Sequence, residues 1–223
     1  MVFAFTTGTR EVRIEPPGLS GVLGVPDNAA GLVIFAHGSG SGRHSPRNTH
    51  VAGRLREAGM ATLLLDLLTP EEERDRANVF DIRLLASRLI EATGWAARQD
   101  RTRGLPVGYF GASTGGGAAL VAAAVCGPEI AAVVSRGGRP DLAGGALLQV
   151  VAPTLLIVGS LDGPVIEMNR EAQARMHAEV ELVIVPGAGH LFEESGTLDQ
   201  VIEHGRGWFQ QHFRRVKAGE AAR

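Results

Sequence analysis

Cysteine and lysine are almost absent from this sequence of 223 residues. Cys126 is the single cysteine and Lys217 the single lysine, so nearly all of the basic charge is arginine. One cysteine excludes an intramolecular disulfide and any zinc site built from several cysteines. Because Cys126 falls on a predicted apolar helix, we expect it to be a buried structural thiol.

The sequence also has no large excess of either charge and no long apolar run. Its formal net charge is −2, which argues against a nucleic-acid partner. No apolar stretch reaches the length of a membrane span. Residues 1–10 lack the basic start and the apolar run of a signal peptide. We therefore expect a cytoplasmic protein with no membrane partner.

Short apolar runs alternate with amphipathic segments along the chain, and no repeat or linker divides it. Strands are predicted near residues 11–15, 19–25, 31–37, 60–66, 106–112, 129–135, 150–159 and 180–185. Helices are predicted near residues 47–58, 79–98, 114–124, 165–177 and 197–216. This alternation predicts one α/β domain over residues 1–223, with a mostly parallel sheet of about eight strands between helices on both faces. The first two strands are expected to be antiparallel additions to that sheet.

A tight turn, Gly111-Ala112-Ser113-Thr114-Gly115, joins an apolar strand to an alanine-rich helix. Such a turn strains its central residue, and the flanking glycines leave room for close backbone contact. The serine hydroxyl then stands clear of the sheet at a helix N-terminus, where amide groups favour negative charge. This context predicts a nucleophile at Ser113. The alternative is a serine that only caps the helix.

Ser113, Asp162 and His190 each follow a predicted strand, in that order along the chain. The loops after parallel strands meet at one edge of the sheet, where ligands bind. A serine hydroxyl becomes nucleophilic when a neutral imidazole takes its proton, and a carboxylate on the other ring nitrogen orients that imidazole. We therefore predict Ser113 as nucleophile, His190 as base and Asp162 as the orienting acid. Asp141, which follows the preceding strand, is the alternative acid.

Other histidines and acids have simpler interpretations. Asp66 is expected to cap a strand end or anchor a loop. Three histidines fall on predicted helices, where solvated or core-edge positions are usual: His177, His204 and His212.

The Ser–Asp–His order, the turn around Ser113 and the glycine turns at 159–163 and 187–192 together resemble the α/β-hydrolase fold. Within that fold the chain is similar to dienelactone-hydrolase-like proteins over nearly its whole length. The resemblance implies a serine hydrolase without a large cap domain, acting on a small carboxylic ester or lactone through an acyl-enzyme. It implies no metal and no organic cofactor. Dienelactone hydrolases carry a cysteine where this chain has Ser113, a difference that bears on the substrate.

The same resemblance predicts two backbone amides for an oxyanion hole. One is Thr114, directly after the nucleophile, and the other is Ser39 in the loop that starts at His37, with Gly40 as the alternative. A phosphate loop is the other interpretation of the glycines at 38–42. The spacings of a dinucleotide fingerprint and of a P-loop are both missing there.

Four basic residues follow strands that end near the predicted site: Arg43, His44, Arg136 and Arg139. Arginines in such positions can hold a substrate carboxylate. The alternative is that they pair with acidic residues and fix the loops. The polar segment 67–78 is predicted to be a loop, the start of the next helix or a small lid.

Hydrolysis of a small-molecule substrate is the favoured function, by a monomer or a homodimer in which Trp208 and Phe209 lie in the core or at an interface. One alternative is an acyltransferase, in which an alcohol or amine replaces water. The other is a non-catalytic binding protein on a hydrolase scaffold.

Overall fold

The computed structural model describes residues 8–219. The prediction that residues 1–10 are not a signal peptide falls mostly outside the described residues. The strands are β1 (Thr9–Ile14), β2 (Leu19–Gly24), β3 (Leu32–Ala36), β4 (Ala61–Leu65), β5 (Val107–Ala112), β6 (Ile130–Arg136), β7 (Thr154–Gly159) and β8 (Val180–Val185). They form one sheet in the order β1-β2-β4-β3-β5-β6-β7-β8. β2 runs antiparallel to β1 and β4, and the other neighbours are parallel. The predicted mostly parallel sheet of eight strands is therefore confirmed.

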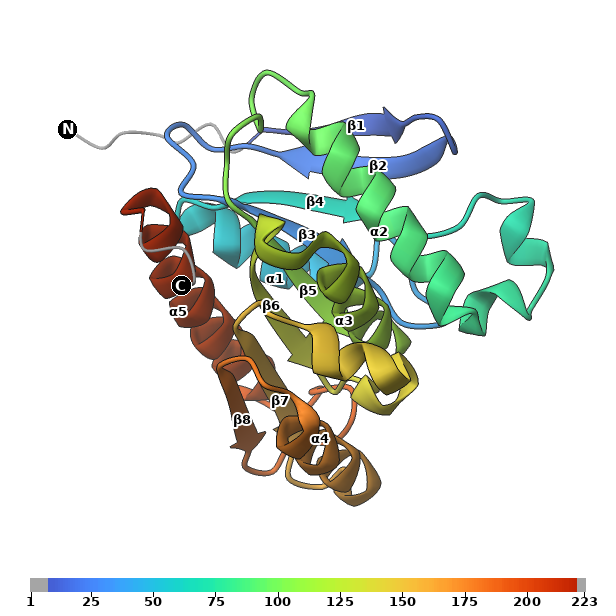
Figure 1. The fold of residues 1–223 in the computed structure, drawn as a ribbon, viewed down its shortest axis with the longest axis vertical. Helices are drawn as coiled ribbons and strands as arrows, with labels where there is room; N and C mark the ends of the chain where they lie inside the picture. Colours follow the sequence, from blue (N-terminus) through green and yellow to red (C-terminus); the bar gives the residue numbers. More distant parts are fainter. Residues whose placement is uncertain (1–7, 220–223) are drawn as a thin grey trace.

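Helices cover both faces of this sheet (Figure 1). The helices are α1 (Pro46–Glu57), α2 (Ile82–Ala97), α3 (Thr114–Cys126), α4 (Gly163–Arg175) and α5 (Thr197–Lys217). Short 3-10 turns connect them: η1 (Glu72–Arg74), η2 (Asn78–Phe80), η3 (Gly127–Glu129) and η4 (Pro140–Gln149). Residues of α2, α3 and η4 share one buried apolar cluster, and residues of α1 and α5 share another. The central strands lie between these two cores.

Strand β3 shows why the central strands are uniformly apolar. All five of its residues are buried, because successive side chains point to opposite faces and both faces are covered. Ile34 belongs to the core under α2 and α3, and Phe35 to the core under α1 and α5. Trp208 and Phe209 of α5 are buried in this second core, so both residues stabilise the fold from inside.

Several element boundaries differ from the prediction. Strand β7 begins at Thr154 and not near residue 150, because Pro153 has no amide hydrogen for a ladder. Helix α2 begins at Ile82, because the Asp81 carboxylate accepts the amides of Arg83 and Leu84 at 3.0 Å each. An N-cap of this kind defines where a helix starts. Residues before it form η1 and η2 instead.

The predicted burial of Cys126 needs correction. Its thiol is half-buried at the end of α3, with Sγ 3.8 Å from the buried hydroxyl of Tyr109. Burial raises the pKa of this thiol, so the thiolate is disfavoured at neutral pH. The residue is therefore a weakly reactive thiol at the edge of the core.

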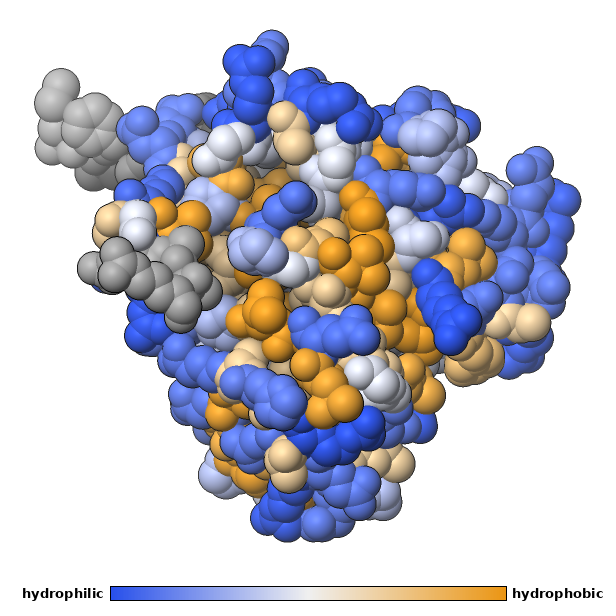
Figure 2. All heavy atoms as spheres, viewed as in Figure 1, coloured by the Kyte–Doolittle hydropathy of each residue, from blue (hydrophilic) through white to orange (hydrophobic). Residues whose placement is uncertain are grey.

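On the face shown in Figure 2, apolar side chains gather toward the centre, over α3 and η4. Val125 of α3 and Leu148 of η4 are exposed by 68% and 51%. Among the helices of residues 8–219, none is long and apolar enough to cross a membrane. A monomer or a homodimer stays a prediction.

Candidate active site

Ser113 stands at a strained turn between β5 and α3. Its backbone has φ 51° and ψ −124°, a left-handed conformation that costs energy for a residue other than glycine. A Cβ at Gly115 would overlap the carbonyl oxygen of Ala36, so only glycine lets the start of α3 reach the end of β3. The Ser113 amide donates to the Arg136 carbonyl at 3.3 Å, and the Ser113 carbonyl accepts from the Arg139 amide at 3.0 Å. The turn is thus fixed to the loop after β6.

Asp162 and His190 meet beyond the ends of β7 and β8. His190 Nδ1 lies 2.6 Å from Asp162 Oδ2, and the Asp162 side chain is only 15% exposed. A Cβ at Gly159 would overlap the carbonyl oxygen of Ala188, which shows how closely the histidine loop lies against the end of β7. The Asp162 carboxylate holds the proton on Nδ1, so Nε2 is left as the basic nitrogen.

Two further side chains, which the sequence analysis did not single out, hold the histidine loop. The Ser160 hydroxyl accepts the Gly187 amide at 2.8 Å, and Glu194 Oε1 accepts the Gly189 amide at 3.1 Å. Both acceptors lie a few residues from Asp162 or His190. Their hydrogen bonds to the histidine loop form only in the folded turns, and the sequence pattern does not specify the geometry of these turns.

The loop after β6 lies between Ser113 and His190. A Cβ at Gly137 would lie 3.6 Å from His190 Cε1, and residues 136 and 139 are hydrogen-bonded to the Ser113 backbone. Over residues 8–219, no hydrogen bond joins Ser113 Oγ to His190. Catalytic hydrogen bonds are often long without substrate and shorten when it binds. The three predicted residues are thus gathered at one sheet edge, with the Asp–His contact formed.

The two predicted oxyanion donors also lie at this edge. Thr114 is the first residue of α3, where an amide has no acceptor within its own helix. The Ser39 amide donates to Thr114 Oγ1 at 3.1 Å. A Cβ at Gly38 would lie 3.7 Å from Ser113 Oγ. The loop after β3 is therefore in contact with the turn that carries Ser113.

His37 holds this loop in place, a role the sequence analysis did not assign. The Leu67 amide donates to His37 Nε2 at 3.1 Å. Because Nε2 accepts, the proton is on Nδ1, which lies 2.9 Å from the Gly38 carbonyl and donates to it. His37 thus links the loop after β3 to the end of β4.

Of the four basic residues, three make contacts with acidic side chains. Both carboxylate oxygens of Asp66 bind Arg43, through its backbone amide at 2.7 Å and its Nη1, which confirms Asp66 as a loop anchor. His44 lies 3.9 Å from the Glu11 carboxylate. Arg139 binds Asp141 through two hydrogen bonds of 2.8 and 2.7 Å. Asp141, the alternative orienting acid, is therefore paired with Arg139. The acid that contacts His190 is Asp162.

Arg136 differs from the other three. It is 8% exposed, and within the described chain its Nε and Nη1 have no hydrogen-bond partner. Its guanidinium lies 5.9 Å above the centre of the Phe192 ring. Burial, and secondarily the charge of Arg47, lowers the pKa of Arg136 to about 10. A charge in this position costs free energy unless a ligand pairs with it.

The remaining histidines lie elsewhere. His50 is on α1, His204 and His212 are on α5, and His177 follows the end of α4. Among the residues that the structure describes, no group of three or more histidine, cysteine, aspartate or glutamate side chains could hold a metal ion. A reaction without a cofactor stays a prediction.

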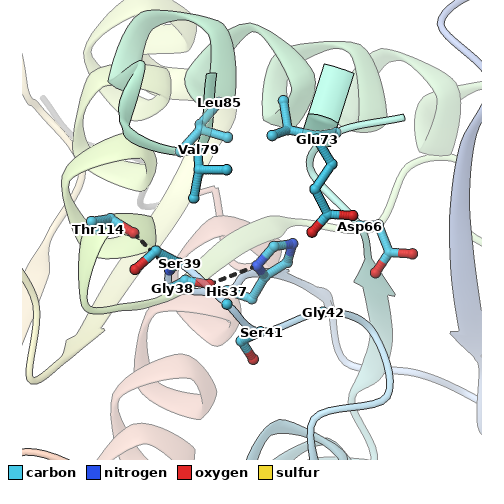
Figure 3. Close-up of a pocket in the computed structure, with 12 residues that line it drawn as sticks. His37, Gly38, Ser39, Ser41, Gly42, Asp66, Glu73, Val79, Leu85 and Thr114 are labelled. Carbon is cyan, nitrogen blue, oxygen red and sulfur yellow. Dashed lines mark hydrogen bonds between the residues drawn. The ribbon is translucent and has the colours of Figure 1, made fainter. Parts of the chain in front are cut away.

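A cavity of about 200 Å³ opens beside the predicted oxyanion donors (Figure 3). Ser39 and Thr114 lie at one end, and Val79 and Leu85 form an apolar wall. Leu68 also lines the cavity. Asp66 and Glu73 lie at the other end, with the Glu73 carboxylate directed toward His37. The polar segment 67–78 therefore forms a wall of this cavity.

Comparisons with known proteins match this chain to one family over most of its length. The model of the dienelactone hydrolase family matches residues 19–204. The crystal structure of a dienelactone hydrolase from Anabaena variabilis ATCC 29413 is 54% identical, with a TM-score of 0.87, and the match covers 92% of this chain and 98% of that one. Est1E from Butyrivibrio proteoclasticus has a TM-score of 0.77 at 17% identity, covering 93% of this chain and 99% of that one. This second likeness shows the fold alone.

A curated relative is longer than this chain. "Putative phosphoribosyl transferase Rv0571c" from Mycobacterium tuberculosis strain H37Rv is 64% identical over 203 residues, which are 91% of this chain and 46% of that protein. The chain thus spans about half the length of this relative. The family match and the shared fold confirm the resemblance seen in the sequence, and the chain belongs to the dienelactone hydrolase family.

Proposed function

We propose that this chain is a serine hydrolase that cleaves a small carboxylic ester or lactone through an acyl-enzyme. Ser113 Oγ attacks the carbonyl carbon while His190 Nε2 takes its proton. The amides of Thr114 and Ser39 bind the oxyanion. His190 then gives the proton to the leaving alcohol oxygen. A water molecule, deprotonated by His190, then attacks the acyl carbon. His190 returns this proton to Ser113 Oγ as the Oγ–acyl bond breaks and the carboxylic acid leaves.

The observation that carries this proposal is the combination of the Ser113 turn with the His190–Asp162 pair at one sheet edge. The turn holds the hydroxyl at a helix N-terminus, and the 2.6 Å contact fixes the imidazole tautomer. Nucleophile, base and orienting acid are the three roles that this chemistry requires. Family membership supports hydrolysis in general, and these residues support the serine mechanism in particular.

The name phosphoribosyl transferase belongs to a longer relative. The match with this chain covers 46% of that protein, so more than half of its length lies outside the match. The glycine-rich loop at 38–42 is the candidate phosphate site in this chain. Its first part instead contacts the Ser113 turn through Gly38, and its Ser39 amide binds Thr114. These contacts favour an oxyanion loop over a phosphate loop.

Labelling with a fluorophosphonate probe tests the proposal, because the probe forms an adduct only with an activated serine. The wild-type protein is expected to react and Ser113→Ala is not. The control is Ser87→Ala on α2, where the hydroxyl only donates to the Leu84 carbonyl. In p-nitrophenyl acetate hydrolysis, Ser113→Ala and His190→Ala should each lose about 10⁴-fold or more in kcat.

The outcomes separate the alternatives. Equal labelling of wild type and Ser113→Ala would contradict the nucleophile assignment. No adduct on the folded wild-type protein would favour a non-catalytic binding scaffold. An acyltransferase would label normally, but added alcohols or amines would divert most of the acyl group from water.

A further inference from the structure

The cavity beside the oxyanion donors and the His190–Asp162 pair lie on opposite sides of β5. Apart from Thr114, which directly follows Ser113, the cavity is lined by residues after β3 and β4, whereas His190 and Asp162 follow β8 and β7. The order β4-β3-β5-β6-β7-β8 separates these two groups across the strand that carries Ser113. A general acid must lie next to the leaving oxygen. The alcohol part therefore faces His190, and the acyl part faces the cavity.

We infer that this cavity binds the acyl group and that Glu73 selects acyl chains with a positive charge or a hydrogen-bond donor at their far end. The inference rests on the proposed serine hydrolase. It assigns a substrate class, amino- or hydroxy-substituted short acyl esters, that the family match does not give.

The size and lining of the cavity define the chain that fits. Its volume is about 200 Å³, and an apolar cavity of about 150 Å³ can hold benzene. An acyl chain of roughly six carbons fits that space. Leu68 and Leu85 are buried and Val79 is half-buried, so these three side chains offer the middle of the chain an apolar surface. The polar residues His37 and Ser41 also line the cavity.

The acidic end of the cavity has one carboxylate that is available to a ligand. Asp66 is neutralised by Arg43, which binds both of its oxygens. Glu73 makes no ion pair and no side-chain hydrogen bond with any residue of the described chain. Its neighbour Glu72 binds Arg88 instead. Glu73 is therefore the uncompensated charge at this end.

The basic residues near the site had predicted a substrate that carries a carboxylate. The negative charge of Glu73 favours the opposite kind of acyl group. A substrate carboxylate at the end of the acyl chain would meet Glu73 and be repelled. Arg43 is close to the cavity, but Asp66 already occupies its guanidinium. An ammonium or hydroxyl group at the same place would donate to Glu73. The favoured acyl chain thus has an apolar middle and a donor at its end.

Three p-nitrophenyl esters of matched length test the selection at pH 7: hexanoate, 6-aminohexanoate and the adipate monoester. Wild-type kcat/KM is expected to rank the ammonium ester first and the carboxylate ester last. In Glu73→Gln, the ratio of ammonium to neutral ester should fall by roughly two- to five-fold, as for an exposed ion pair. Glu71→Gln, two residues away and outside the cavity lining, should keep the wild-type ratio.

A second variant tests which part of the substrate the cavity binds. Val79→Trp narrows the cavity from a half-buried position on η2. It should lower kcat/KM for ethyl hexanoate by at least about ten-fold, since the acyl chain loses its space. Hexyl acetate, with the same carbons on the alcohol side, should be hydrolysed almost as before.

The possible results are distinct. Unchanged charge ratios in Glu73→Gln, or a larger loss on hexyl acetate in Val79→Trp, would overturn the inference and leave the hydrolase intact. No hydrolysis of the neutral ester by wild type, together with no labelling of Ser113, would overturn both.

Discussion

Replacing Arg136 by methionine should stabilise the protein, although it removes a charged residue beside the active site. Burial lowers the pKa of Arg136 from the ordinary value of a guanidinium to about 10. This drop means that the folded state disfavours the charged form by on the order of 3 kcal/mol. The guanidinium regains part of this from the Phe192 ring, to which a desolvated cation contributes up to about 2 kcal/mol. Methionine can fill the same space without charge. We expect a net gain of about 1 kcal/mol.

The sign of the pH dependence fixes the conditions for this measurement. A basic group with a lowered pKa destabilises the folded state whenever it is charged there. The cost is complete below the folded pKa, about 10, and disappears as the pH rises from there toward the ordinary pKa of a free guanidinium. Urea unfolding at pH 7 to 8 therefore measures the whole penalty.

Arg139→Met is the matched control, because Arg139 follows the same strand but is partly exposed and bound to Asp141. A surface pair of this kind contributes about 0–1 kcal/mol, so this variant should be neutral or slightly less stable. If Arg136→Met were less stable than wild type by more than about 1 kcal/mol, the guanidinium would have a native partner and the reasoning would be wrong. Turnover of acidic and neutral esters by Arg136→Met then shows whether substrate supplies that partner.

Three further predictions concern stability. Gly115→Ala should lower the unfolding free energy by more than about 2 kcal/mol, because its Cβ would overlap the backbone of Ala36. Gly207→Ala, on the exposed face of α5 with open space around it, should raise it by up to about 1 kcal/mol; urea unfolding measures both. Burial lowers the pKa of His212 below 6.5, so folding opposes its protonation and wild-type stability should fall as the pH drops below 6.5. In His212→Phe that acid-induced fall should be smaller, as thermal unfolding from pH 8 to 5 would show.

The fold and the candidate nucleophile were predictable because their signals are local. Strand and helix follow from the spacing of apolar residues, and the turn at Ser113 follows from five adjacent residues. The order of Ser113, Asp162 and His190 along the chain then indicated one site, since loops after parallel strands share an edge.

The cavity and the pairing of the arginines could not be predicted, because they depend on contacts between distant segments. Arg43 and Arg136 look alike in the sequence, as both follow buried strands. Arg43 meets Asp66 on the neighbouring strand end. Arg136 lies against the Phe192 ring and near the charge of Arg47, and its Nε and Nη1 find no hydrogen-bond partner among residues 8–219. Whether each arginine finds a carboxylate depends on strand order and loop conformation. Neither of these can be read from a short stretch of sequence.

The hydrogen bond from the Ser39 amide to Thr114 Oγ1 has a consequence for how binding energy divides between substrate and transition state. On the proposed mechanism, an incoming carbonyl oxygen must compete with a hydroxyl for this amide. A neutral ester carbonyl is an acceptor of similar strength, so exchanging the two gains little. A tetrahedral oxyanion makes a bond about twice as strong. Because the carbonyl and the oxyanion must both displace the Thr114 hydroxyl, this contact weakens ground-state and transition-state binding by the same amount, which raises KM and leaves kcat unchanged.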